Sequence, residues 1–294
     1  MGASDTVIRP ATAADLPALY RVWQRADGNV VDDGSTAVLP LHAHLVEHGT
    51  TLVAERGGEP IGFAAALEAD EIVFLSDVFV VPQGEGIGRR LLDALFAQHP
   101  SPHRYTAASS DPRAVPLYTS FGMTPRGALL YLEWTPTDRE AASLRAPRST
   151  RVTDIDDSVI ASMCHWFGRD RSADLRYWRS LGAVAVVVDA PAAGAGLVCC
   201  STPWVPEGSA TRLGPIASRA DDDAAAADTV LCVIATAASL PDRSPTIRLV
   251  IGATHPAVGS LLELGFVETD RDAYLASDDT ISDLRRHVGA ADIW

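Results

Sequence analysis

The sequence contains no lysine, because all 24 of its basic residues are arginine. This absence excludes every mechanism that depends on a lysine side chain. Excluded are the phosphate-binding loop that ends in lysine, Schiff-base catalysis and the attachment of pyridoxal phosphate. A GC-rich coding bias is the ordinary explanation for such a composition.

Cysteine is also scarce, with four residues in the whole chain. Cys164, Cys199, Cys200 and Cys232 all lie in the second half, and their spacing matches no C-x-x-C pair. Neither a zinc ribbon nor a redox-active dithiol is therefore predicted.

Long apolar runs and basic clusters are missing as well. No apolar run approaches the ~20 residues of a membrane-spanning helix, and the first residues lack the basic end and apolar stretch of a signal peptide. We expect a cytoplasmic protein without a membrane partner. The net charge of −14 includes no basic stripe for a phosphate backbone, so nucleic acid is not an expected partner either.

The chain is long enough for two domains, since its 294 residues fit two units of about 150 residues each. A polar, proline-containing segment at 135–150 follows an apolar run that ends at Trp134. We place the first domain at residues 1–138, a linker at 139–150 and the second domain at 151–294.

Both halves alternate strand-like and helix-like segments. In the first half, apolar residues at 16, 19, 20 and 23 recur at helical spacing, and two apolar runs flank the turn Gly57-Gly58. This pattern predicts an α/β fold with a mixed, mostly antiparallel sheet and helices on its faces. Aligning DPRAVPLYTSFGM with THPAVGSLLELGF matches Ala114 with Ala257 and Gly122 with Gly265, which indicates an internal duplication.

The most informative segment is DVFVVPQGEGIGRRLLDAL at 77–95, which reads as a strand, a glycine-rich turn and a helix. Glycines let the backbone approach a ligand closely, and the N–H groups at the start of a helix form a site for a pyrophosphate. The dinucleotide pattern G-x-G-x-x-G fails because Arg89 stands at its last position. The pattern that fits is Q-x-x-G-x-G, beginning at Gln83.

This loop resembles the coenzyme A loop of the GNAT superfamily of N-acetyltransferases, which has the form Q/R-x-x-G-x-G/A. The resemblance spans most of residues 6–134 and includes IRPATAADLPAL, TTLVAERGGEPIGFAA and AVPLYTSFGM, in the order of the family. It implies acetyl-CoA as acyl donor and a strand that splays from its neighbour to meet the pantetheine arm. The cofactor-binding residues that it implies are Val78, Phe79, Val80, Gln83, Gly84, Glu85, Gly86, Ile87, Gly88, Arg89 and Asp111.

One departure from the family is the spacing before the loop. Pro82 directly precedes Gln83, whereas family members usually have two or three residues between them. Either the loop is about two residues shorter or the strand register is shifted by two. Asp111 stands where many relatives have an asparagine that contacts the cofactor, and it serves equally as a helix cap.

Tyr118 matches the family's tyrosine, which protonates the departing coenzyme A thiolate. A phenol with a pKa near ~10 can give its proton to such a basic leaving group. The alternative is an aromatic side chain that only anchors its helix. For the general base we favour Asp77, followed by Glu71 and Glu68; otherwise these are solvated charges at strand ends. Holding amine and thioester together supplies much of the rate, so no covalent intermediate is expected.

The second half resembles a divergent GNAT domain without the glycine-rich loop. Asp221, Asp222 and Asp223 stand at the start of a helix, where they satisfy its dipole and repel a pyrophosphate, and Leu261 takes the place of Tyr118. We predict that this half does not catalyse the reaction. The uses left open for this half are a wall of the acceptor pocket, a dimer contact and the binding of a ligand of its own.

Other functions stay open beside amine acetylation. The chain could bind acyl-CoA as a sensor or assembly protein. His44, Glu47 and His48 match the H-x-x-E-H zinc signature, although Gly49 ends the helix directly afterwards; no metal is expected. His42, His44 and Glu47 could instead line the acceptor pocket. The acceptor is expected to be a small-molecule amine or a protein N-terminus, and a homodimer stays open.

Overall fold

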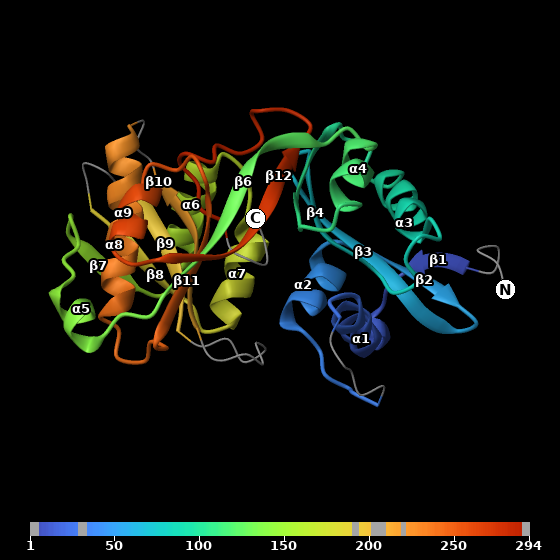
Figure 1. Ribbon diagram of the computed structural model, residues 1–294, viewed down its shortest axis with the longest axis horizontal. Coiled ribbons are helices and arrows are strands. Elements are labelled where there is room, and N and C mark those ends of the chain that lie inside the picture. Colours follow the sequence, from blue (N-terminus) through green and yellow to red (C-terminus); the bar gives the residue numbers. More distant parts are fainter. Residues whose placement is uncertain (1–5, 29–33, 190–193, 201–209, 219–221, 290–294) are drawn as a thin grey trace.

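The computed structural model describes residues 6–28, 34–189, 194–200, 210–218 and 222–289. Its strands form one sheet of twelve, in the order β1-β2-β3-β4-β5-β12-β6-β11-β10-β9-β8-β7 (Figure 1). The first six strands are β1 (Thr6–Pro10), β2 (Thr50–Arg56), β3 (Glu59–Ala69), β4 (Ile72–Val80), β5 (His103–Ala108) and β6 (Thr124–Trp134). The last six are β7 (Thr150–Thr153), β8 (Val184–Val188), β9 (Gly194–Cys199), β10 (Ala210–Ser218), β11 (Thr246–Gly252) and β12 (Val267–Ala276).

Helices cover both faces of the sheet. They are α1 (Leu16–Ala26), α2 (Pro40–His48), α3 (Ile87–Phe96), α4 (Ala114–Thr119), α5 (Asp138–Ser143), α6 (Asp157–Phe167), α7 (Ser172–Ser180), α8 (Asp223–Ala238) and α9 (Val258–Glu263). Helices α3 and α4 share a core with the first half of the sheet on one face, as α8 and α9 do with the second half. Helices α1, α2, α6 and α7 pack on the other face. The predicted α/β fold, with a mostly antiparallel sheet flanked by helices, is confirmed.

The two halves exchange their last strands. β12, from the second half, pairs with β5 of the first half, and β6 pairs with β11 of the second half. β6 and β12 also pair with each other, antiparallel, and Figure 1 shows them side by side in the middle of the molecule. The halves therefore share one continuous sheet instead of forming two separate ones. The domain division at 139–150 stays a prediction, and α5 begins just before that segment.

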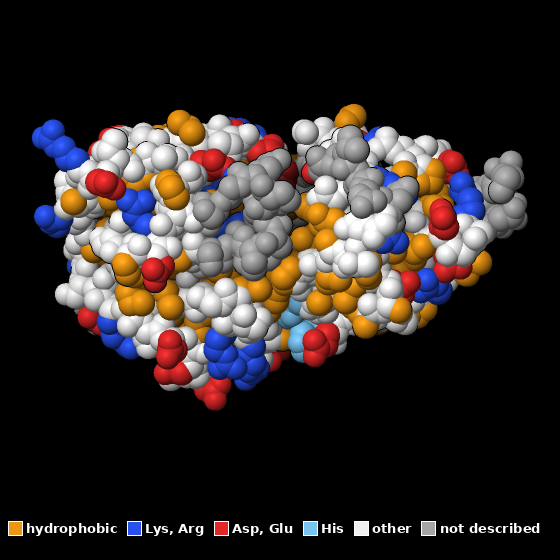
Figure 2. Space-filling model, turned by 90° about the horizontal axis from the view of Figure 1, so that it is seen from below, with side chains coloured by type: hydrophobic (Ala, Val, Ile, Leu, Met, Phe, Trp, Pro, Cys, Tyr) orange, Lys and Arg blue, Asp and Glu red, His pale blue; other side chains and the backbone are white. Residues whose placement is uncertain are grey.

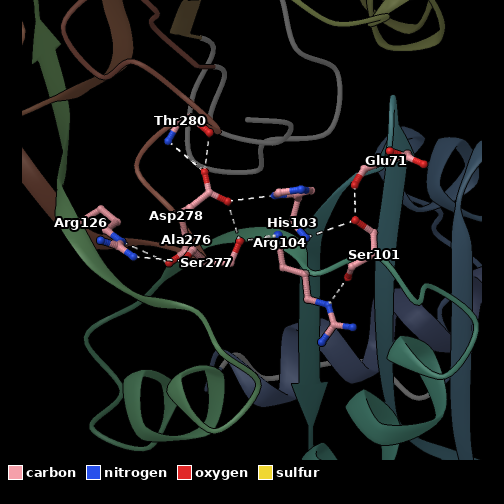
Figure 3. A network of polar contacts seen from close by, with 9 residues as sticks. All are labelled: Glu71, Ser101, His103, Arg104, Arg126, Ala276, Ser277, Asp278 and Thr280. Carbon is pink, nitrogen blue, oxygen red and sulfur yellow. Dashed lines mark hydrogen bonds and ion pairs between the residues drawn. The ribbon is translucent and has the colours of Figure 1, made fainter.

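Backbone and side-chain contacts fasten the residues that follow β12 to the first half (Figure 3). The backbone N–H of Ser277 donates to the carbonyl of Arg104 at 2.8 Å, and the Arg104 N–H donates back to Ser277 Oγ at 3.1 Å. His103 Nδ1 lies 3.0 Å from Asp278 Oδ2, and Arg126 donates to the Ser277 carbonyl at 3.1 Å. These contacts fix the register of a strand that comes from the far end of the chain.

Apolar side chains are also found on the surface where the two halves meet. On the face shown in Figure 2, hydrophobic side chains gather along the boundary between the two halves, while charged side chains are scattered over both. In the described ranges, no helix combines the length and the apolar character that a membrane crossing requires.

Because each half completes the sheet of the other, cutting the chain between them is expected to leave them together. A protease site would be inserted between Leu144 and Arg148, a mostly exposed stretch between α5 and β7. After cleavage we expect the two fragments to elute together in size-exclusion chromatography and to separate only in urea. The uncut chain is the control, and fragments that separate without denaturant would contradict the exchange.

Candidate functional site

The first half contains a fork between two parallel strands. β4 pairs with β5 only from Ile72 to Leu75, where the last pair is Leu75 with Thr106. β4 nevertheless continues to Val80, paired with β3, and a register shift there leaves Ser76 as an extra residue. Thr106 Oγ1 donates to the Leu75 carbonyl at 2.8 Å and closes the base of the fork. Beyond it, among the described residues, no strand pairs with the β5-facing edge of β4, so this edge can bind an extended ligand through its backbone.

A glycine loop lies directly at the open end of this fork. Gly84 and Gly86 have φ angles of 84° and 74°, and a Cβ atom added to either would meet nothing within 4 Å. Gly86 is the N-cap of α3, so the free N–H groups of that helix border an open space, as an anion site requires. Val81 donates to the Ile61 carbonyl at 2.9 Å. Strand pairing thus continues to Val81, directly before Pro82, and the register of β4 shifts earlier, at Ser76.

The polar side chains at the rim of the loop are held by arginines. Arg113 donates to Gln83 Oε1 at 2.7 Å and to Asp111 Oδ1 at 2.9 Å. Asp111 also accepts from the Arg113 backbone N–H at 2.9 Å, and these bonds hold the pKa of its carboxyl below its usual range. These bonds hold the turn that leads into α4, whose N-cap is Arg113, and the cofactor contact of Asp111 stays a prediction.

The outer side of the loop is fixed in the same way. Arg56 pairs with Glu85 at 2.5 Å, and Arg89 donates to Ser120 Oγ at 2.8 Å. The predicted phosphate-binding segment is thus pinned on one side by β2 and on the other by the end of α4.

Tyr118 lies on α4 above the fork and is buried in the core that α3 and α4 share with the sheet. Its burial raises the pKa of the phenol well above the ordinary value, and the negative charges of Asp77, Asp111 and Asp272 raise it further. At neutral pH the hydroxyl is therefore a stable proton donor.

Two carboxylates, those of Asp77 and Asp272, border the fork. The sequence had indicated only Asp77. Asp77 follows the extra residue of β4 and pairs with Ala65 of β3. Asp272 lies on β12 next to Ala273, which pairs with Ala108, the last residue of β5. Its carboxylate accepts a hydrogen bond from the Tyr131 hydroxyl at 2.7 Å. The charged run at 268–272 inside an apolar strand was the available signal, but only the strand exchange brings it to the fork.

Glu71 and Glu68 are not brought to the fork. Both lie near the turn between β3 and β4, and Glu71 has a φ of 63° within that turn. Six residues of strand separate Glu71 from Asp77, which corresponds to about 20 Å. The Glu71 carbonyl accepts a hydrogen bond from Ser101, as Figure 3 shows, and Glu68 pairs with His99.

The histidines of α2 take part in contacts within the core and between the halves. His44 Nε2 lies 3.1 Å from Asp174 Oδ1 of α7, and burial lowers the pKa of His42 to about 4. His48 and Glu47 are exposed at the end of the helix. Within the described residues, no three His, Cys, Asp or Glu side chains gather as a metal site would require. The zinc interpretation therefore gains no support from this region.

The second half contains the same kind of fork, but the chain itself fills it. β10 pairs with β11 only as far as Leu213 and Leu249, and a register shift follows before Ile216. Ile216 and Val288 exchange two backbone hydrogen bonds, at 2.9 and 3.0 Å. The neighbouring Gly289 pairs with Val250 of β11, so residues 288–289 lie between the two diverging strands.

The helix that follows this second fork begins with a carboxylate as its cap. Asp222 is the N-cap of α8 and accepts from the Ala225 N–H at 2.6 Å, so its carboxylate occupies the start of the helix. Leu261, at the place of the tyrosine, is fully buried. Asp221 lies outside the described residues.

Comparison with known proteins agrees with this architecture. Residues 16–123 match the acetyltransferase (GNAT) family. A protein of Pyrococcus horikoshii, provisionally described as an acetyltransferase, has a TM-score of 0.73 at 16% identity, over 98% of this chain and 95% of that one. A tandem GNAT protein from the clavulanic acid biosynthesis pathway has a TM-score of 0.61 at 13% identity, over 94% and 99% of the two chains.

A third similar structure is a GCN5-related N-acetyltransferase from Kribbella flavida. It has a TM-score of 0.59 at 15% identity, over 92% of this chain and 71% of that one. At such identities the three structures establish the fold alone. No curated protein sequence matches the chain significantly.

The geometry of the glycine loop can be tested with two similar substitutions. Gly86 has a φ of 74°, whereas Gly88 lies within α3 and its added Cβ would be 3.6 Å from Leu117, an ordinary contact. A side chain in the left-handed region costs roughly 1–2 kcal/mol, and alanine in a helix gains roughly 0.5–1 kcal/mol over glycine. We expect Gly86→Ala to lower the free energy of unfolding in urea and Gly88→Ala to leave it unchanged or raise it. Equal effects would contradict this loop conformation.

Proposed function

We propose, on the premise that residues 16–123 match the acetyltransferase (GNAT) family, that the chain transfers an acetyl or short acyl group from acyl-CoA directly to a primary amine. The reaction is assigned to the fork of the first half. One arrangement in the described residues supports this proposal. It combines the unpaired edge of β4, the N-terminus of α3 behind an open glycine loop, and the protonated Tyr118. We place the reaction in the cytoplasm.

The donor fits the fork through its backbone groups. Val78, Phe79 and Val80 form the edge of β4 that faces the fork, and their peptide groups can pair with the amides of the pantetheine arm. The second half supports this assignment, because there the exchange of hydrogen bonds between Ile216 and Val288 fills the same kind of fork with peptide groups. The pyrophosphate would lie against the loop and helix start formed by Gln83, Gly84, Glu85, Gly86, Ile87, Gly88 and Arg89.

The chemistry requires one proton donor and one proton acceptor. The amine attacks the thioester carbonyl as a neutral nucleophile, the C–S bond breaks, and the departing sulfur takes the proton of Tyr118. A carboxylate at the fork accepts the proton that the ammonium must first lose. Asp77, the residue favoured from the sequence, and Asp272 both border this place, whereas Glu71 lies at the far end of β4.

We assign one donor site to each chain and a supporting role to the second half. Its fork is filled by residues 288–289, and Asp222 occupies the start of its helix. Leu261 at the place of the tyrosine has no proton to give. The second half then contributes strands and a covering wall to the site of the first half.

Titration calorimetry with acetyl-CoA tests the location of the donor site. We expect one equivalent to bind per chain, and Gly86→Glu to weaken binding at least about 100-fold because a carboxylate would enter the anion site. Gly259→Glu is the matched control, since an added Cβ at this residue of α9 also meets nothing within 4 Å. Binding that survives Gly86→Glu would move the site elsewhere, and no binding to the native chain would contradict the proposal.

Amine acetylation itself is tested with Tyr118→Phe. The assay follows release of the coenzyme A thiol with polyamines, aminoglycosides, amino acids and peptides as acceptors. Loss of a placed acid lowers kcat by roughly 10²–10⁴, while the Kd for acetyl-CoA should stay within about threefold. Since the pKa of the phenol is raised, the native enzyme should show no loss of rate from ionisation of this group up to about pH 10. Tight acetyl-CoA binding without turnover of any amine would favour a sensor.

A further inference from the structure

The exchanged strand brings a carboxylate of the second half to the fork of the first half. β12 follows β5 in antiparallel register, with Leu275 opposite Thr106 and Ala273 opposite Ala108. Thr106 marks the base of the fork and Ala108 is the last residue of β5. Asp272 precedes Ala273 on β12. Because the two strands are antiparallel, Asp272 lies just beyond the end of β5, level with the opening of the fork.

Asp272 and Tyr118 reach this place from opposite faces of the sheet. Tyr118 is buried in the core on the α3 side, together with Leu91. Tyr131, which donates to Asp272, packs against the core on the other face, where Leu129 is buried. The phenol and the carboxylate therefore lie on the two opposite faces of the sheet beside the fork.

The surroundings of Asp272 suit a proton acceptor. Its side chain is half-buried, and burial raises the pKa of the carboxyl above its ordinary value. The negative charge of Asp270 on the same strand raises it further, while the hydrogen bond from Tyr131 of β6 lowers it. From the other elements, Tyr118 of α4 lies within electrostatic range of Asp272, and the charges of Asp77 and Asp111 act on the same tyrosine. Oδ2 accepts from Tyr131, whereas Oδ1 accepts no hydrogen bond from the described residues.

We propose that Asp272 takes the proton from the acceptor's ammonium group, so that a strand of the second half completes the catalytic site of the first. This inference rests on the proposed function. Asp272 accepts one proton, the neutral amine forms the C–N bond, and the C–S bond breaks. The thiolate takes the proton of Tyr118, which is restored by the second proton that the nitrogen loses. Asp272 then releases its proton to solvent, leaving an amide and the free thiol.

The test is the pH dependence of kcat/KM, measured with an amine that the native enzyme acetylates. The acidic limb of this profile reports the base, because the base must be unprotonated to act. Asp272→Asn should remove the limb and lower kcat/KM by roughly 10²–10⁴ at neutral pH, without weakening acetyl-CoA binding. Asp272→Glu should recover part of the rate. Asp270→Asn, two residues away on the same strand and exposed, is the matched control and should keep nearly the native rate.

Tyr131→Phe gives a second readout that a merely structural residue would not show. Losing this hydrogen bond removes an interaction that lowers the pKa of Asp272, so the acidic limb should move to higher pH. An unchanged limb in Asp272→Asn, or a limb abolished by Asp77→Asn instead, would overturn the proposal and leave acetyl transfer intact. If Asp272→Asn loses acetyl-CoA binding together with activity, and Asp272→Glu recovers neither, the residue is structural and the proposal fails. A native chain that binds acetyl-CoA but acetylates no amine refutes the proposed function, and this assignment with it.

Discussion

The pairing of β6 with β12 is the interaction on which the rest of the structure depends. Each of these strands leaves its own half and lies beside the last parallel strand of the other, so that one sheet of twelve strands is continuous through the molecule. Because backbone hydrogen bonds set the register on both sides of β12, the position of Asp272 relative to β5 is fixed by the sheet itself. A site built in this way is positioned by rigid strands and not by loops alone.

The two halves show one architecture with the fork open in the first half and filled in the second. In both, the parallel pairing stops at equivalent residues, Thr106 and Leu249, after which the preceding strand bulges and diverges. The first half keeps the opening and follows it with glycines. The second half fills it with Val288 and caps the following helix with Asp222. Unsatisfied backbone groups and an empty apolar space are both costly, so a fork without a ligand needs such a replacement.

Much of the local structure could be predicted from the sequence. Apolar periodicity located most of the strands and helices of the first half, and the glycines at 84 and 86 indicated the turn into α3, where positive φ angles are indeed found. The strand exchange could not be predicted, because the backbone of β5 can form its hydrogen bonds equally well with β6 or with β12. For the same reason the sequence did not indicate that Asp272 lies near the fork. Glu71 was considered as the base, although it lies at the end of β4 that is far from the fork. Residues 288–289 gave no signal, since their importance lies only in the space they fill.

The exchange also has a consequence for how the chain comes to be folded. The edge of β5 that pairs with β12 is made first, but the residues that pair with it lie 165–171 residues later in the chain. At synthesis rates of about 5–20 residues per second this strand waits on the order of ten seconds for its neighbour. During that time an apolar sheet edge is exposed to other nascent chains or to chaperones. The ribosome thus delivers this neighbour of β5 long after β5 itself, and the continuous sheet can close only once both halves have been made.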